Sequence, residues 1–210
     1  MKRCILCLTV LLLVFGLANQ TKANLTLDFV GGYALSPYGD TIGGWNFNVT
    51  SPITVNGLGF WDEGSNGLSG NHDVGLWNGD GTVLLASTTI TNASTPAGST
   101  SPDGRWLFND IQDLILPPGN YFLGATFLDG DPDQARLEAT ESTISGITFI
   151  QARQRVFTSS LAFPEEPIGF WVDDGVFGPN LQVAVPEPTT LLLIGSGLLG
   201  LAGFRRKLKK

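Results

Sequence analysis

His72 is the single histidine of this 210-residue chain, and Asp62 and Glu63 precede it by about ten residues. A histidine near carboxylates could act as a general base or as a metal ligand. Transition-metal sites usually combine several histidine or cysteine ligands, and here no second histidine exists. We therefore expect His72 to be a turn residue that opens a short strand.

Three aspartates, Asp129, Asp131 and Asp133, alternate along the chain as the first ligands of a calcium-binding loop do. The sixth position of that pattern holds Gln134 instead of glycine, and the twelfth holds Thr140 instead of glutamate. The segment is therefore no EF-hand. We expect a solvated acidic turn, with a weak structural Ca²⁺ site as the alternative, and we predict no other metal site and no cofactor.

Paired carboxylates also raise the question of glycoside hydrolysis. That chemistry needs two acids across a cleft, about 5 to 9.5 Å apart, and the neighbouring pairs Asp62-Glu63 and Glu165-Glu166 do not establish such a geometry. No G-x-S-x-G motif stands where a serine hydrolase would need one. We predict no catalytic residue and no enzyme, and a surface hydrolase is the least favoured alternative.

The five tryptophans are Trp45, Trp61, Trp77, Trp106 and Trp171. Exposed aromatic rings offer flat apolar faces on which sugars stack, whereas buried ones fill the core. Four of the five lie in apolar strand patterns, which favours burial. Trp61 precedes a Gly-rich acidic loop, so it is the best candidate for exposure and for a glycan contact. A carbohydrate-binding module is therefore the alternative function.

The elements that would position these residues are strands. Short alternating stretches rich in β-branched and aromatic residues are separated by Gly, Pro, Asn and Asp, which is typical of an all-β fold. Trp45, Phe47 and Val49 alternate and should face one side of a sheet. We predict an antiparallel, jelly-roll-like β-sandwich over residues 24–184. The predicted strands are 25–30, 41–49, 53–61, 73–77, 82–91, 105–111, 121–127, 135–139, 147–151, 168–172 and 181–185.

The N-terminus reads as a secretory signal peptide over residues 1–23. Lys2 and Arg3 precede an apolar run, and the small residue Ala23 marks the favoured cleavage point. Both cysteines of the chain, Cys4 and Cys7, lie inside this signal. The exported domain therefore has neither disulfides nor thiol chemistry.

The exported domain is strongly acidic. Residues 24–185 hold 18 acidic side chains against four arginines and no lysine, a formal charge of −14. Such a field repels nucleic acid and anionic lipid headgroups. We therefore predict no nucleic-acid partner, and we expect contacts with cations or with neutral or basic partners.

The C-terminal segment 185–210 reads as a short membrane anchor. Pro186, Glu187 and Pro188 come first, and the uncharged run 189–204 would form a helix of about 24 Å, somewhat short of a bilayer core. The basic residues Arg205, Arg206 and Lys207 follow and should keep the C-terminus in the cytoplasm.

This order, Pro-Glu-Pro, apolar Gly-rich run and basic end, resembles the PEP-CTERM sorting signal of Gram-negative bacteria. The resemblance implies recognition of Pro186, Glu187 and Pro188 by an exosortase, a membrane protease or transpeptidase that would cut near them. It also implies an inner-membrane precursor, a mature form at the cell surface or outside the cell, and species that make exopolysaccharide and biofilm.

Pieces of the exported part resemble a β-sandwich domain that recurs in PEP-CTERM proteins, over roughly residues 41–127. The pieces are 45–49, 53–55, 58–62, 72–77 and 116–121. No activity attaches to this likeness. We therefore expect a structural or interaction protein of an exopolysaccharide matrix.

Overall fold

The computed structural model describes residues 24–36, 39–130, 132–168 and 176–184. They belong to one compact unit, Asn24–Ala184. The described residues form strands and connecting segments without a helix, and every strand pairing is antiparallel. The prediction of an all-β antiparallel fold is confirmed. Within these ranges no helix has the length and apolar character needed to cross a membrane. The predicted signal peptide (1–23) and apolar run (189–204) lie outside them.

The strands come in chain order with short connections. They are β1 (Asn24–Leu25), β2 (Leu27–Val30), β3 (Tyr33–Leu35), β4 (Thr41–Val49), β5 (Ile53–Glu63), β6 (His72–Asn78), β7 (Leu84–Ile90), β8 (Thr95–Ala97), β9 (Gly104–Leu116), β10 (Gly119–Phe127), β11 (Ala135–Leu137), β12 (Thr140–Thr143), β13 (Ile147–Val156), β14 (Glu166–Pro167), β15 (Val176–Phe177) and β16 (Pro179–Val183).

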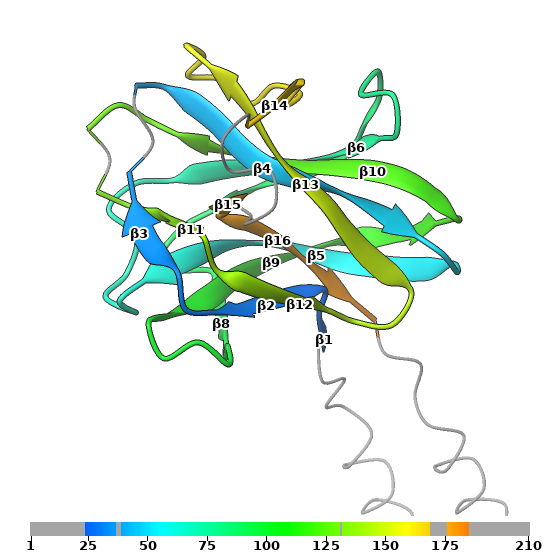
Figure 1. Cartoon of the computed structure of the whole chain (residues 1–210), viewed down its shortest axis with the longest axis horizontal. Coiled ribbons are helices and arrows are strands. Elements are labelled where there is room, and N and C mark those ends of the chain that lie inside the picture. Colours follow the sequence, from blue (N-terminus) through cyan, green and yellow to red (C-terminus); the bar gives the residue numbers. More distant parts are fainter. Residues whose placement is uncertain (1–23, 37–38, 131, 169–175, 185–210) are drawn as a thin grey trace, which may run out of the picture. The chain divides into compact units, whose positions relative to one another are not determined.

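Two large sheets dominate the unit. One has the order β14-β13-β4-β10-β6-β7 and the other β1-β16-β5-β9-β8. They lie in separate layers, and the small sheets β15-β11-β3 and β12-β2 lie beside them (Figure 1). β4 pairs along its whole length with β10 in an unbroken register and, on its other side, with β13, where the register shifts between Phe149 and Gln151.

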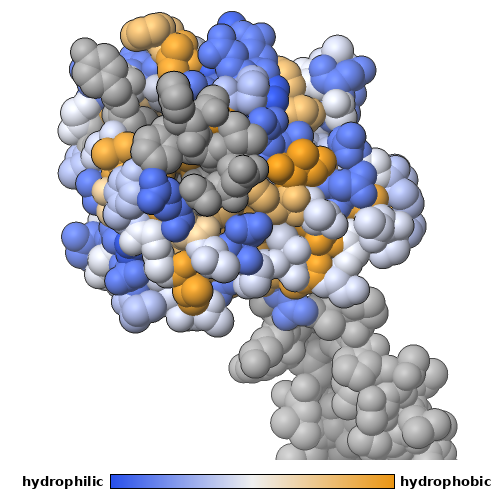
Figure 2. Space-filling view, in the orientation of Figure 1, coloured by the Kyte–Doolittle hydropathy of each residue, from blue (hydrophilic) through white to orange (hydrophobic). Residues whose placement is uncertain are grey.

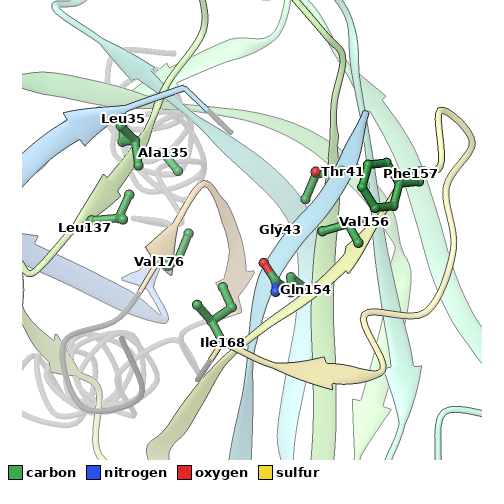
Figure 3. Close-up of a pocket in the computed structure, with 10 residues that line it drawn as sticks. All are labelled: Leu35, Thr41, Gly43, Ala135, Leu137, Gln154, Val156, Phe157, Ile168 and Val176. Atoms are coloured by element: carbon green, nitrogen blue, oxygen red, sulfur yellow. The ribbon is translucent and has the colours of Figure 1, made fainter. Parts of the chain in front are cut away.

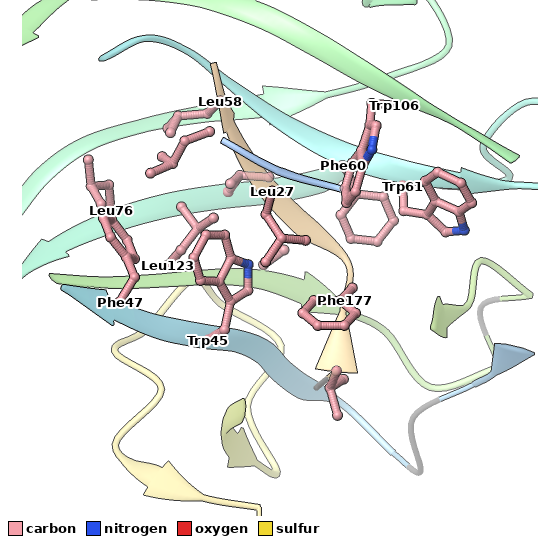
Figure 4. Packing of buried hydrophobic residues seen from close by; sticks show 14 of the residues in the cluster. Leu27, Trp45, Phe47, Leu58, Phe60, Trp61, Leu76, Trp106, Leu123 and Phe177 are labelled. Carbon is pink, nitrogen blue, oxygen red and sulfur yellow. The ribbon is translucent and has the colours of Figure 1, made fainter. Parts of the chain in front are cut away.

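Alternation along the strands builds the core. Trp45, Phe47 and Val49 on β4 are fully or almost fully buried, as their spacing predicts. Phe60 of β5 meets the larger sheet, since its ring lies 5.1 Å from that of Phe127 on β10. Figure 4 shows side chains of both sheets meeting in this cluster.

The outer face of the larger sheet is covered by the segment between β13 and β14. The ring of Phe163 lies 4.8 Å from Phe122 and 6.2 Å from Trp77, edge to face in both cases. Arg153 donates from Nε to the carbonyl of Pro164 and stacks on Phe122. These contacts bury Trp77 and Phe122 on a face that the strand pattern alone would leave open to solvent.

The structure departs from the predicted elements in several places. The short strands β3, β12, β14 and β15 have no predicted counterpart, and β13 continues to Val156 instead of ending at residue 151. The segment 92–104, which no predicted strand covers, contains the short strand β8, and β9 continues to Leu116 instead of ending at residue 111. The extension is irregular, because the register between Val55 and Gly57 of β5 shifts opposite residues 110–114. Such a bulge interrupts the two-residue alternation from which strands are predicted. The predicted strand 168–172 lies almost wholly outside the described residues.

Candidate functional site

Trp61, the best candidate for an exposed glycan contact, is completely buried, so this candidate is wrong. Its ring lies directly across from Trp106 on β9, 5.0 Å away, and Phe29 of β2 covers it at 4.6 Å. Its Nε1 donates to Glu63 at 2.6 Å. The Gly-rich loop after Trp61 does not open this face of β5, because β2, distant in sequence, packs over it.

The other described tryptophans are also buried. Trp45 donates from Nε1 to the carbonyl of Pro179 at 2.9 Å, and Trp106 donates to Asp28 at 3.3 Å. Trp171 lies outside the described residues. The indole N–H groups of Trp45, Trp61 and Trp106 therefore all donate to acceptors of the protein itself, and the rings are buried where a sugar cannot stack on them.

His72 begins β6 and is buried with no exposed surface. Its ring stacks on Phe60 with centroids 3.8 Å apart. Nδ1 faces the carbonyl of Thr126 at 2.7 Å, and Nε2 faces Oδ2 of Asp133 at 3.0 Å. The expectation of a simple turn residue misses this role, because the two partners lie more than 50 residues further along the chain.

Asp133 joins His72 to a neighbouring loop. Its Oδ2 also accepts hydrogen bonds from the backbone N–H groups of Ser69 and Gly70, at 2.8 and 3.2 Å. Burial acts to raise the pKa of Asp133, but the bonds from His72, Gly70 and Ser69 outweigh it and lower the pKa below its ordinary value. The ring of His72 thus bridges the Thr126 carbonyl and the Asp133 carboxylate, one at each nitrogen.

The calcium hypothesis concerned Asp129, Asp131 and Asp133. Asp131 lies outside the described residues, and the backbone N–H of Asp129 donates to Oδ1 of Asp40 at 2.9 Å. Among the residues that can be described, no group of three or more His, Cys, Asp or Glu side chains is placed to hold a metal ion. The structure assigns Asp133 instead to the bonds with His72 and the loop 69–70.

Each of the two acid pairs has a member that is held by an arginine. Asp62 is buried and accepts from Nε of Arg105 at 2.8 Å, and Oδ1 accepts from the N–H of Gly67. Glu165 lies 3.8 Å from Arg155, with both side chains about half exposed. These carboxylates have structural partners.

Arg136 of β11 is the centre of a buried charge network. Its Nη2 lies 3.1 Å from Oε1 of Glu63 and 2.6 Å from Oδ2 of Asp103, and Nη1 donates to the carbonyl of Gly32. Its side chain is only 7% exposed. Because Glu63 also accepts from Trp61, this network ties β11 and the loops that hold Gly32 and Asp103 to the tryptophan pair.

An apolar pocket of about 240 Å³ lies between the small sheet β15-β11-β3 and the strands β4 and β13 (Figure 3). Its lining comprises Leu35, Thr41, Gly43, Ala135, Leu137, Gln154, Val156, Phe157, Ile168 and Val176. Only Thr41 and Gln154 bring polar side chains. None of the lining residues has an acid, a base or a thiol, so this pocket offers packing surface rather than acid–base chemistry.

A second hollow, of about 540 Å³, lies between β7 and the extended part of β9. It is lined by residues 85–88 and 110–114. Asp110 and Asp113 stand on the β9 side, and the β7 side carries no charge. We call this hollow the β7–β9 groove, and its lining is more polar than that of the apolar pocket.

Exposed apolar residues are scattered over the unit. They include Val83, Leu84, Ile115 and Phe157. Figure 2 shows apolar side chains in separate groups among polar ones on the face in view.

The comparisons with known proteins concern the C-terminal segment. Residues 184–207 match the family model described as the PEP-CTERM protein-sorting motif. Curated proteins gave no match. The chain is thus a PEP-CTERM protein: the motif marks it for export, for membrane anchoring as a precursor and for processing by an exosortase. Pro186, Glu187, Pro188, Arg205, Arg206 and Lys207 fall inside the matched range but outside the described residues.

Proposed function

We propose that this chain is a non-enzymatic β-sandwich protein, jelly-roll-like in arrangement, with a structural or interaction role in the exopolysaccharide matrix of a Gram-negative bacterium. The observation that carries the proposal is the sorting motif at residues 184–207. It begins where the compact unit Asn24–Ala184 ends. A cut near Pro186–Pro188 would therefore release the whole folded unit.

The orientation follows from charge. Arg205, Arg206 and Lys207 directly follow the uncharged run 189–204, and basic residues are retained on the cytoplasmic side. The folded unit then faces the outside, and the anchor serves only until the exosortase acts. Its 24 Å length, about 6 Å less than the bilayer core, suits a temporary anchor.

The non-enzymatic assignment is supported by how the acidic side chains are used. Asp62 is paired with Arg105, Glu63 with Arg136, and Asp133 with His72. Each pair stabilises packing between strands or loops. A net charge of −14 on residues 24–185 suits a protein that remains soluble beside neutral polysaccharide and binds cations or basic partners.

The matrix role is tested with the mature protein recovered from the cell surface. We expect it to co-sediment with extracellular polysaccharide from its own source and to remain in solution with dextran of similar size. If it stays in solution with both polymers at every ionic strength, and a deletion strain forms an unchanged matrix, the proposed role is wrong. No part of this test depends on Trp61, because that ring is buried.

A further inference from the structure

The two strands that border the β7–β9 groove each leave one edge without a strand. β7 is the last strand of the six-stranded sheet. β9 lies between β5 and β8, but β8 pairs only with Trp106, Leu107 and Phe108. From residue 109 to residue 114, the described chain therefore offers no strand on the side of β9 that faces away from β5.

These two edges face each other. Nδ2 of Asn109 on β9 donates to the backbone carbonyl of Thr89 on β7, at 2.8 Å. Next to this bond the edges separate, and residues 85–88 and 110–114 line the hollow of about 540 Å³. The groove is thus an open stretch between the edges of two different sheets, closed at one end by Asn109.

The direction of the Thr89 carbonyl fixes which backbone groups of β7 point into the groove. In an antiparallel pair, alternate residues turn both their N–H and C=O groups toward the same neighbour. The register with β6 is regular from Ile90 to Ala86. Ser87, two residues before Thr89, therefore directs its N–H and C=O away from β6 and toward the groove.

β7 lacks most of the features that usually protect an edge strand. Edges are commonly guarded by charged side chains or proline, yet residues 81–102 contain no charged side chain, and β7 contains no proline. A bulge opposite Leu76 and Trp77 affects only the start of the strand. The uncharged edge is notable in a unit with 18 acidic side chains.

The opposite wall provides selectivity. Asp110 and Asp113 are exposed on β9, and the groove-lining residues include no cation. The bulge of β9 opposite Asn56, at residues 111–113, makes this wall project from the regular ladder. Charge complementarity therefore favours an occupant with basic side chains.

We propose that the β7–β9 groove binds an extended peptide segment rich in lysine or arginine, which adds as a strand to β7 while Asp110 and Asp113 pair with its basic side chains. The proposal deepens the interaction role given above and rests on it. A second copy of this chain is a poorer occupant, because it would bring the same two aspartates and a second charge of −14 to the groove.

The test uses the mature protein and a fluorescent seven-residue peptide of alternating lysine and valine, followed by fluorescence anisotropy at low salt. Ser87→Pro should weaken binding about tenfold or more, because proline removes the N–H that faces the groove. Ser87→Ala is the matched control and should bind within about twofold of wild type. Since Ser87 does not bond to β6, both variants should keep the wild-type Tm.

Charge and backbone contributions are separated by two further measurements. Asp110→Asn combined with Asp113→Asn should weaken binding several-fold and reduce its dependence on salt. A peptide N-methylated at every residue, which has no N–H group left on either edge to form the strand ladder, should fail to bind.

Equal binding of the N-methylated peptide, or unchanged affinity in folded Ser87→Pro, would overturn the proposal. Dimerisation of the protein that disappears in Ser87→Pro would also overturn it, by assigning the edge to a second copy. If the wild-type protein does not bind the peptide but still associates with the polysaccharide, this inference alone is refuted. Intact peptide binding without matrix association would refute the proposed function alone.

Discussion

Nε2 of His72 lies 3.0 Å from Oδ2 of Asp133, and the other ring nitrogen lies 2.7 Å from the carbonyl of Thr126. Both contacts are buried or partly buried, and their partners lie 54 and 61 residues further along the chain. The sole histidine thus links β6 to β10 and to the segment before β11 through hydrogen bonds.

His72→Phe should lower the free energy of unfolding by about 3 kcal/mol. The phenyl ring can keep the stacking on Phe60, but it leaves the buried Asp133 carboxylate and the Thr126 carbonyl without their hydrogen-bond partner on the ring. Urea denaturation measures the change. Asp129→Asn, at an exposed position of the same acidic segment, should stay within about 0.5 kcal/mol of wild type. Equal losses in the free energy of unfolding of His72→Phe and Asp129→Asn would contradict a special role of the His72–Asp133 contact.

Acid should destabilise the unit through Asp133 and Asp28. Burial acts to raise the pKa of both carboxylates, but hydrogen bonds lower each pKa below the ordinary 3.8. The bonds to Asp133 come from His72, Gly70 and Ser69. The bonds to Asp28 come from Ser99, Thr100 and Trp106. A lowered pKa contributes stability that is present above pH 3.8 and is lost as the pH falls through the folded-state value.

Thermal unfolding between pH 7 and pH 2.5 measures this effect. The Tm of wild type should fall steeply below about pH 4. In Asp28→Asn combined with Asp133→Asn, the Tm should be lower at neutral pH and should fall less in acid. Parallel pH profiles of variant and wild type would show that other carboxylates govern acid unfolding.

Arg136→Met should cost about 3 kcal/mol, because it removes a buried guanidinium and leaves the partly buried carboxylates of Glu63 and Asp103 without their shared cation. Adding Glu63→Gln and Asp103→Asn should recover part of the loss, since the unpaired charges disappear. Arg155→Met is the matched control. Its contact with Glu165 is 3.8 Å long and about half exposed, so its loss should cost less than about 1 kcal/mol. Equal costs at the two arginines would contradict the buried network.

Trp61→Ala should destabilise the unit by about 3 to 5 kcal/mol, as the removal of a large buried ring does. The ring contacts Phe29 and Trp106 and has no exposed surface. Phe157→Ala removes a ring that is 82% exposed and should change stability by less than about 0.5 kcal/mol. Chemical denaturation compares the two. If Trp61→Ala is as stable as wild type and binds glycan more weakly, the prediction is wrong and Trp61 is a glycan contact at the surface.

Local sequence patterns predicted the regular part of the fold. The range 41–49 of β4 matches its prediction, and the alternation of Trp45, Phe47 and Val49 places all three in the core. The antiparallel all-β class follows from such patterns, because they depend on neighbours along one strand.

Features made by distant segments were not predictable in this way. Trp61 is covered by Phe29, His72 is paired with Asp133, and Arg136 reaches Glu63 across more than 70 residues of chain. The β7–β9 groove depends on the short reach of β8 along β9 and on a bulge, neither of which has a signature in the sequence. The sorting motif is the opposite case, since its order of residues is itself the signal.

The central claim, that the chain is sorted and cut at its C-terminal motif, is tested most directly by the intact mass of the mature form recovered outside the cell. The mass should correspond to a chain that begins near Asn24 and ends close to Pro186–Pro188, and replacement of Glu187 by alanine should leave the precursor in the membrane fraction. A surface form that still contains residues 189–210 would contradict the account.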